Sequence, residues 1–386
     1  MSIADWFNSE PVRDFRKRIL KNQKLSECSK CYAEESSGAT SRRDRSNQKS
    51  VIFKQAFHDS FAQSPGNQHF DDSGFTATQP IDLHIDLGNY CNLACKMCNS
   101  QASSKIAVQE VKWGIESSKP FVGTNWTNDS AVWNSFKQQL LSISRLNNIH
   151  FMGGETLLTD RFEDLVDTLI AHNRFDVCLS FVTNGTVFKP QLLTKLLGFK
   201  RVGIEVSIET VDEHNSYVRQ GTNTELVLAN IVRYRDQCNG TSVTLTLRPA
   251  ISALTIGYYG TMLQYALQQK LLVKSLLVTR PAFLHVDILP AAIKLQYLTQ
   301  YKEILQQLGK NTNGLDYNAS DPNNYQHMIR EQAQACVNLL STPVPDNLDQ
   351  LHSQLVAHCR KWDQVYNYNA RQLYPELAEI WDRYDY

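Results

Sequence analysis

The sequence predicts an α/β protein in which strands alternate with helices between residues 81 and 290. Apolar and polar residues alternate at 81–87, as in a half-buried strand, and five more strand-like stretches follow at 148–154, 178–183, 202–208, 242–247 and 275–279. Between two of them, Phe162, Leu165 and Leu169 recur at helical spacing. This alternation implies parallel pairing, in either a barrel or an open doubly wound sheet.

Two regions flank this repeat. Residues 1–80 are expected to form a helical segment, in which Ser9 can cap a helix, followed by a flexible linker near 60–80 that is rich in Gly, Pro, Ser and Asn. Residues 291–386 are expected to be helical, with Tyr and Trp side chains that pack this tail onto the sheet. We therefore divide the chain into 1–80, 81–290 and 291–386.

The composition excludes several classes of protein. The 386 residues carry 39 basic and 39 acidic side chains, and this balance argues against a polybasic nucleic-acid binder. No apolar run is long enough for a membrane span, and the first residues do not resemble a secretory signal. We expect a cytoplasmic protein, where stable disulfides are rare, so the nine cysteines favour metal ligation over cross-linking.

The strongest motif is Cys91-Asn-Leu-Ala-Cys95-Lys-Met-Cys98, directly after the first predicted strand. Clustered thiolates favour zinc, Cu(I) or iron–sulfur. A closed zinc site needs a fourth ligand, and a [4Fe–4S] cluster usually takes four cysteines. This run supplies three, which would leave one iron open for another molecule. A core-facing turn, or zinc with a distant fourth ligand, is the alternative.

The spacing Cys-x3-Cys-x2-Cys after a first strand resembles the signature of the radical S-adenosylmethionine (SAM) superfamily. That resemblance implies a partial (β/α)6 TIM-like barrel with a [4Fe–4S] cluster on Cys91, Cys95 and Cys98. It also implies that the open iron binds SAM, whose reductive cleavage yields methionine and a 5′-deoxyadenosyl radical that abstracts hydrogen from a substrate. Met97 departs from the aromatic residue that many members carry there.

Four further stretches resemble family motifs near SAM, at the strand ends where parallel barrels form their sites. Gly153-Gly154-Glu155 resembles the motif that holds the SAM amino group, and Arg219 resembles the arginine that contacts its carboxylate. Asn184 lies in a Thr-Asn-Gly turn, and Ser207 precedes Glu209, where members often carry Asp. The resemblance thus implies seven SAM-binding residues: Gly153, Gly154, Glu155, Asn184, Ser207, Glu209 and Arg219. Strand-ending turns and a solvated arginine are the alternatives.

A second cysteine pair precedes the repeat. Cys28 and Cys31 begin a stretch, Cys-x2-Cys-x3-Glu35-x2-Gly38-x2-Ser-Arg42, that resembles a segment found before the barrel in members of the twitch and SPASM type. That resemblance implies an auxiliary iron–sulfur cluster, which would need distant partners such as Cys336 or Cys359. A zinc site or unligated thiols are the alternatives, and the seven-cysteine run of a full SPASM domain is absent from the sequence.

Four other polar residues have a structural interpretation beside a functional one. We interpret His352, His358 and Cys359 as satisfied or exposed side chains of one helix, and Arg248 either as facing the site or as part of a salt bridge. The family resemblance implies an enzyme that modifies a peptide or protein by crosslinking, epimerisation or oxidation, with a reductase or flavodoxin-type electron donor as its partner. The alternatives are a nucleotide, sugar or other small-molecule substrate, or a non-enzymatic thiolate–metal module.

Overall fold

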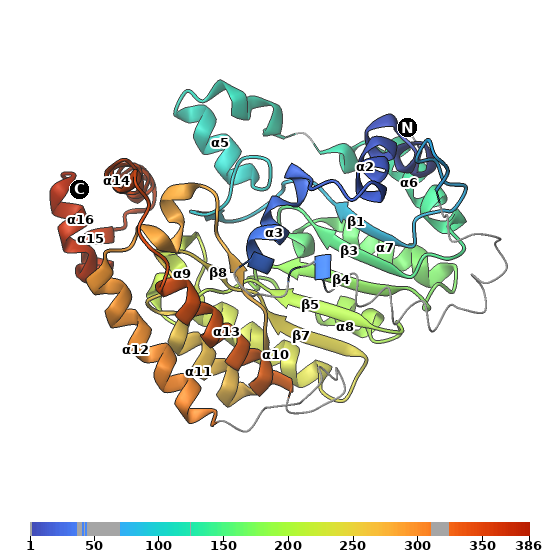
Figure 1. The fold of residues 1–386 in the computed structure, drawn as a ribbon. Helices are drawn as coiled ribbons and strands as arrows, with labels where there is room; N and C mark the ends of the chain where they lie inside the picture. Colours follow the sequence, from blue (N-terminus) through green and yellow to red (C-terminus); the bar gives the residue numbers. More distant parts are fainter. Residues whose placement is uncertain (1, 37–40, 42, 45–69, 124, 310–323) are drawn as a thin grey trace. The chain divides into compact units, whose positions relative to one another are not determined.

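The computed structural model describes residues 2–36, 41, 43–44, 70–123, 125–309 and 324–386 (Figure 1). The chain divides into two compact units, Met1–Ile81 with Ser135–Leu146, and Asp82–Asn134 with Asn147–Tyr386. The boundaries expected at residues 80 and 290 stay predictions. Gly38, Arg42 and residues 60–69 of the expected linker lie outside the described residues.

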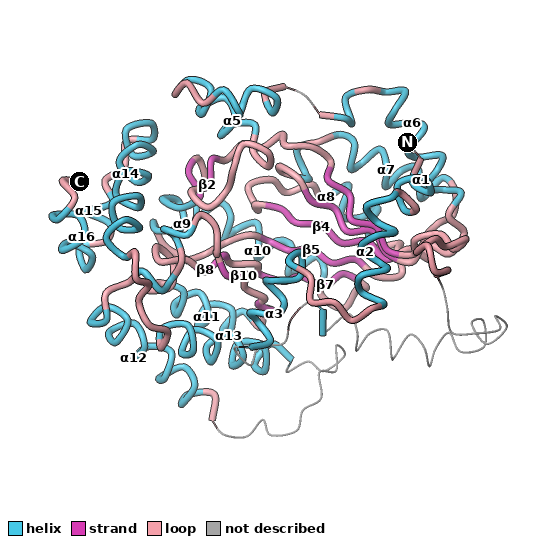
Figure 2. The backbone as a smooth tube through the Cα atoms, turned by 45° about the horizontal axis from the view of Figure 1, so that its top comes forward, coloured by secondary structure: helices cyan, strands magenta, loops and turns pink. Residues whose placement is uncertain are grey.

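The larger unit is built on one parallel sheet, whose strands lie side by side in Figure 2. Its six strands are β1 (Asp82–Asp86), β3 (Asn148–Met152), β4 (Cys178–Thr183), β5 (Val202–Val206), β7 (Val243–Leu247) and β9 (Leu272–Val273). Their order in the sheet follows their order in the chain, without the reversal that a doubly wound sheet requires. Because β1 and β9 are the two edges, the sheet is the predicted partial (β/α)6 TIM-like barrel.

Strand alternation fixes which face of the sheet is buried. Ile149, Phe151, Leu179 and Phe181 are almost fully buried, while the residues between them are half-buried or exposed. The core therefore lies on one face, against helices such as α7, whose Phe162 ring packs edge-on to Phe151 at 4.9 Å.

The sixth strand was predicted wrongly at 275–279. The sheet ends instead with β9 at Leu272–Val273, and residues 276–277 form β10, which pairs with β8 in a separate two-stranded sheet. Two short apolar runs, 271–273 and 276–278, lie on either side of Lys274 and Ser275, and their hydrophobicity does not show which of them joins the main sheet.

Helices connect the strands and extend beyond them. Those of the repeat are α5 (Ser104–Lys112), α6 (Ser130–Ser142), α7 (Asp160–Ala171), α8 (Pro190–Leu196), α9 (Glu213–Val218), α10 (Thr224–Cys238) and α11 (Tyr259–Gln269). The helices after it are α12 (Ala291–Gln307), α13 (Asn324–Leu340), α14 (Leu348–Tyr366), α15 (Ala370–Leu373) and α16 (Ala378–Arg383). The helices before it are α1 (Ile3–Phe7), α2 (Glu10–Leu20) and α3 (Ser29–Ser36).

Short elements complete the chain. The two-residue strands are β2 (Ala94–Cys95), β6 (Arg219–Gln220), β8 (Ala250–Ile251) and β10 (Leu276–Leu277). The short 3₁₀ helices are η1 (Ser26–Cys28), η2 (Glu116–Phe121), η3 (Trp126–Asn128), η4 (Thr156–Leu158), η5 (Ala282–Leu284), η6 (Val286–Ile288) and η7 (Pro375–Leu377). The pairing of β2 with β6 is the one that matters for the site, because β2 contains Cys95.

The smaller unit is organised around a buried arginine. Arg16 of α2 stacks on the Phe7 ring at 4.2 Å and donates hydrogen bonds to the carbonyls of Phe7 and Gly74, at 2.7 and 3.1 Å. Helix α2 begins after Ser9, as expected, although the Ser9 side chain makes no capping hydrogen bond. One cation thus ties α1, α2 and the segment before β1 together.

The aromatic tail packs as expected. Trp362, Tyr374 and Trp381 are each less than 5% exposed, and the Trp381 ring nitrogen donates to the Tyr374 carbonyl. Among the residues that the structure describes, no helix has both the length and the apolar character needed to cross a membrane.

Candidate functional site

The cysteine loop, residues 91–98, follows β1. Backbone hydrogen bonds connect it to β6 and to the residue before β6. Cys95 pairs with Arg219 across the antiparallel ladder of β2 and β6. The next residue, Lys96, donates its amide N–H to the Val218 carbonyl at 2.8 Å. The sequence did not indicate this ladder, because each strand is two residues long. It fixes the position of Cys95 relative to the loop after β5.

The three thiols lie close enough to influence one another electrostatically. Burial raises the pKa of Cys91 to about 11 and raises those of Cys95 and Cys98, and the charges of neighbouring thiols add to the increase for Cys91 and Cys95. The Leu93 amide donates to the Cys91 sulfur at 3.4 Å. Ionising closely spaced thiols that are shielded from water costs free energy. The arrangement therefore favours a bound cation that stabilises the thiolates.

The Gly153–Gly154 pair packs against the start of the cysteine loop. The Gly154 amide donates to the Gly88 carbonyl at 2.7 Å, and a Cβ on Gly154 would lie 2.2 Å from the Tyr90 carbonyl oxygen. Gly153 has φ +123°, which L side chains rarely adopt. Only glycine fits either position, so these residues let the end of β3 approach the loop backbone.

Glu155 is buried, and both of its carboxylate oxygens accept hydrogen bonds. Its carboxylate accepts hydrogen bonds from the Thr183 hydroxyl at 2.6 Å, the Asn184 amide at 2.6 Å and the Leu157 amide at 3.0 Å. Burial raises its pKa despite these donors. The carboxylate therefore joins the end of β3 to the end of β4.

Asn184 joins the end of β4 to the cysteine loop. Its side-chain amide donates to the Asn92 side-chain oxygen at 2.8 Å, and the Asn92 amide donates to the Thr186 hydroxyl at 2.9 Å. Asn92, one residue after Cys91, was not singled out from the sequence, since nothing local to it indicates a partner 92 residues away.

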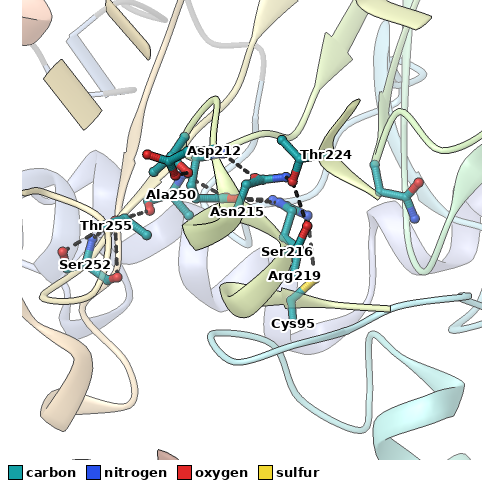
Figure 3. Close-up of polar contacts among 12 residues, drawn as sticks. Cys95, Asp212, Asn215, Ser216, Arg219, Thr224, Ala250, Ser252 and Thr255 are labelled. Carbon is teal, nitrogen blue, oxygen red and sulfur yellow. Dashed lines mark hydrogen bonds and ion pairs between the residues drawn. The ribbon is translucent and has the colours of Figure 1, made fainter. Parts of the chain in front are cut away.

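Glu209 and Arg219 form a buried ion pair. Figure 3 shows Arg219 next to Cys95. Glu209 is 0% exposed; one carboxylate oxygen accepts from Arg219 Nη2 at 2.8 Å and from the Ala250 amide at 3.2 Å, and the other accepts from Arg219 Nε. Arg219 Nη1 also donates to the Cys95 sulfur at 3.6 Å. Ser207, two residues before Glu209, is held by a backbone bond to Thr183 at 2.8 Å.

The remaining polar residues have structural partners. Arg248 forms an ion pair with Glu205 at 3.1 Å, which agrees with the salt-bridge interpretation. His352 contacts the Ile288 carbonyl at 2.6 Å and His358 the Lys96 carbonyl at 3.1 Å, so both histidines are satisfied side chains. Cys359 is fully buried.

The first cysteine pair belongs to the smaller unit. Cys28 ends η1, Cys31 lies in α3, and both are half-buried free thiols. Cys336 and Cys359 are buried in the larger unit, and burial raises the pKa of Cys336 to about 12. Within the described part of the chain, no group of three or more His, Cys, Asp or Glu side chains is arranged around a single metal ion.

A family model matches the part of the chain that contains the cysteine motif. Residues 85–252 match the family model described as the Radical SAM superfamily. The chain carries a radical SAM domain. No curated protein matches the sequence.

Similar solved structures are distant. They include anSMEcpe with bound AdoMet (16% identity, 59% of this chain and 61% of that one, TM-score 0.44) and Streptococcus suis SuiB bound to the precursor peptide SuiA (12%, 68% and 60%, 0.39). The radical SAM methyltransferase TsrM from Kitasatospora setae is also similar (10%, 64% and 43%, 0.37). The chain thus covers less than two thirds of each of these proteins.

The residues of the radical SAM domain fit the [4Fe–4S] cluster and SAM that the family implies. The buried thiol of Cys95 and the half-buried thiols of Cys91 and Cys98 on one loop match the donor set that a three-cysteine cluster requires, which would leave one iron without a protein ligand. A four-iron cluster also spaces its sulfur ligands more widely than a single ion does. The Arg219 guanidinium beside Cys95 offsets the negative charge that such a cluster carries.

Proposed function

We propose that this chain is an enzyme that cleaves SAM reductively and removes hydrogen from a peptide or protein substrate. The observation that carries the proposal is the juxtaposition of three cysteines on one loop with the Glu209–Arg219 pair and the Gly153–Gly154 turn. All of them lie at the carboxyl ends of the parallel strands, where barrels of this kind place their sites.

The cysteine loop would hold the cluster through Cys91, Cys95 and Cys98. When bound, the cluster supplies the electron that splits SAM into methionine and a 5′-deoxyadenosyl radical, which abstracts hydrogen from the substrate. The protein holds the loop in place through the β2–β6 ladder and through Asn184, which bonds to Asn92.

SAM would lie along the strand ends, near Asn184, Ser207 and Arg219. Because Glu155 is 2% exposed and its oxygens already accept three hydrogen bonds, we propose that it acts by fixing the Gly153–Gly154 backbone, which takes the SAM ammonium. Glu209 in turn orients Arg219, whose guanidinium would face both the Cys95 sulfur and the SAM carboxylate.

A peptide or protein substrate is supported by two features. One is the Cys28–Cys31 stretch, which resembles a segment of twitch and SPASM members. The other is the sheet face opposite the core, where His84 and Thr244 are exposed and the His150 ring bonds to the Ser180 hydroxyl at 2.7 Å. By strand alternation the same face also carries the carboxylates of Asp82, Asp86 and Glu205, the last paired with Arg248, and carboxylates suit the amide donors of a peptide better than they suit phosphates.

The proposal is tested by anaerobic reconstitution of the full chain with iron and sulfide, followed by SAM and dithionite. We expect 5′-deoxyadenosine from the wild type, none from Cys95→Ala, and an undiminished yield from Cys238→Ala, a buried cysteine at the end of α10. No product from the wild type, or an equal yield from Cys95→Ala, contradicts SAM cleavage.

The substrate class is tested by isotope transfer. The reconstituted protein is incubated with SAM and an extract of deuterated cells, separated into a peptide and protein fraction and a small-molecule fraction. We expect mass spectrometry to find deuterium in 5′-deoxyadenosine with the first fraction. Deuterium from the small-molecule fraction alone would overturn the peptide assignment while leaving SAM cleavage intact.

The auxiliary cluster on Cys28 and Cys31 is a separate proposal. It predicts that the reconstituted chain holds more than the iron of a single cluster, and that Cys28→Ala lowers the count. About four irons per chain, the content of one [4Fe–4S] cluster, would exclude a second cluster of that type.

A further inference from the structure

A buried ion pair joins the cysteine loop to the C-terminal helix α14. Lys96, between the second and third cysteines of the motif, is 1% exposed, and its ammonium lies 3.0 Å from the Asp363 carboxylate, which is 4% exposed. The two residues are 267 positions apart. Burying two charges is costly, so a pair of this kind persists only where its remaining donors and acceptors are also satisfied.

The network around this pair is satisfied. The Lys96 ammonium lies 4.2 Å from the centre of the Tyr217 ring. Asp363 accepts hydrogen bonds from the Ala370 amide at 2.9 Å, from the Tyr217 hydroxyl at 3.4 Å and from the Tyr386 hydroxyl. Asp363 therefore connects the cysteine loop with α9, α14 and the end of the chain.

Two more residues of α14 contact the same loop. Burial lowers the pKa of His358 to about 3, so the ring is neutral and its Nε2–H donates to the Lys96 carbonyl at 3.1 Å. Trp362, one turn later on the same face of the helix, packs in an apolar cluster with Ala94 and Ile106, against which Cys98 also packs. The loop residues in these contacts are Ala94, Lys96 and Cys98, which surround the second cysteine and reach the third.

We infer that α14 is a clamp that holds the cysteine loop in its cluster-binding conformation, with Lys96 and Asp363 as positioning residues. The inference rests on the assignment of the cluster to Cys91, Cys95 and Cys98. On one side the loop is paired with β6, and Lys96 and Trp362 fasten it to α14. Without the ion pair, the segment from Cys95 to Cys98 would open more often, and the cluster would lose iron through that opening.

The test compares iron release from Lys96→Met and Asp363→Asn with release from the wild type. The full chain is reconstituted anaerobically, iron and sulfide are counted, and a ferrous chelator is added while colour formation is followed. We expect release about tenfold faster in each variant, because each loses the ion pair that ties the loop to α14; the charge left behind in a buried site also lowers the stability of each single variant. Unfolding of each cluster-free chain is measured in parallel by circular dichroism.

Lys294→Met is the matched control. Lys294 is also buried, at 5% exposure, but its ammonium donates to the carbonyls of Asp287 and Thr342, away from the cysteine loop. We expect this variant to lose stability with an unchanged rate of iron release. Equal release from Lys96→Met and the wild type, or equal acceleration in Lys294→Met, would overturn the clamp.

The double variant Lys96→Met/Asp363→Asn covers the case in which a single variant fails to fold. It leaves no stranded charge, so we expect near wild-type stability with iron release still accelerated. If the pair served folding stability alone, both the stability and the rate of iron release of the double variant would return to wild-type values. A wild-type chain that takes up no iron would refute the cluster assignment itself, whereas normal uptake with unchanged release in the double variant would refute the clamp alone.

Discussion

Glu209→Gln tests the buried ion pair beside Cys95 at nearly constant volume. The wild-type carboxylate is 0% exposed and bonds to Arg219 through both oxygens and to the Ala250 amide through one. Breaking a buried pair costs about 3–5 kcal/mol, because the surviving charge stays desolvated. The glutamine oxygen still accepts one of these hydrogen bonds, so we expect the low end, a loss of about 3 kcal/mol in the free energy of unfolding.

The measurement is urea unfolding of the cluster-free full chain, followed by circular dichroism and extrapolated to water. Asp382→Asn is the control, since Arg371 and Asp382 form an ion pair in which both side chains are about half exposed. Exposed pairs contribute at most about 1 kcal/mol, so this variant is expected to unfold almost as the wild type does. A loss below about 1 kcal/mol for Glu209→Gln would refute the argument that this pair anchors the site.

Two further predictions follow from the geometry. Gly154→Ala should reduce the iron bound after reconstitution, because its Cβ would lie 2.2 Å from a backbone oxygen of the cysteine loop; Gly198→Ala, which meets a Phe175 side chain at 3.2 Å, should bind iron normally, and equal iron in both variants would contradict this reasoning. His214 bonds to Asp212 at 3.0 Å and to the Leu373 carbonyl at 2.9 Å; burial opposes its charge, but these bonds outweigh burial and raise its pKa above 6.5. The stability that it contributes is therefore fully present below pH 6.5 and is lost as the pH rises through the raised pKa, so the stability difference between wild type and His214→Gln should shrink from pH 6 to pH 9; a constant difference in urea unfolding would contradict a charged His214.

The sheet could be predicted because its signal is local. Alternation at 148–154 and 178–183 located β3 and β4, and helical spacing located α7, since each pattern reports one buried face. The sixth strand was missed because two short apolar runs, 271–273 and 276–278, follow one another and pair within different sheets. A run of apolar residues predicts that a strand is buried, but it does not show which neighbouring strand it pairs with.

The site could be predicted only in part, for a related reason. The cysteines were recognisable by spacing, and the glycines and Arg219 by their resemblance to family motifs. Asn92 and Lys96 were not, because their partners, Asn184 and Asp363, are distant in sequence. No periodic pattern in the sequence marks polar residues that act through tertiary contacts, so they can be recognised only in the folded structure.

These unpredicted contacts share one role. A cluster held by three thiolates has one covalent anchor fewer than a cluster held by four, and its open iron must stay accessible to SAM. If the cluster binds Cys91, Cys95 and Cys98 as proposed, the loop depends on the rest of the protein for the restraint that a fourth cysteine would supply. Three parts of the structure restrain the loop: β6 pairs with Cys95, Asn184 bonds to Asn92, and Asp363 of α14 forms an ion pair with Lys96. Each anchor fixes a residue next to a cysteine or the cysteine backbone itself, which leaves the sulfurs free to bind iron.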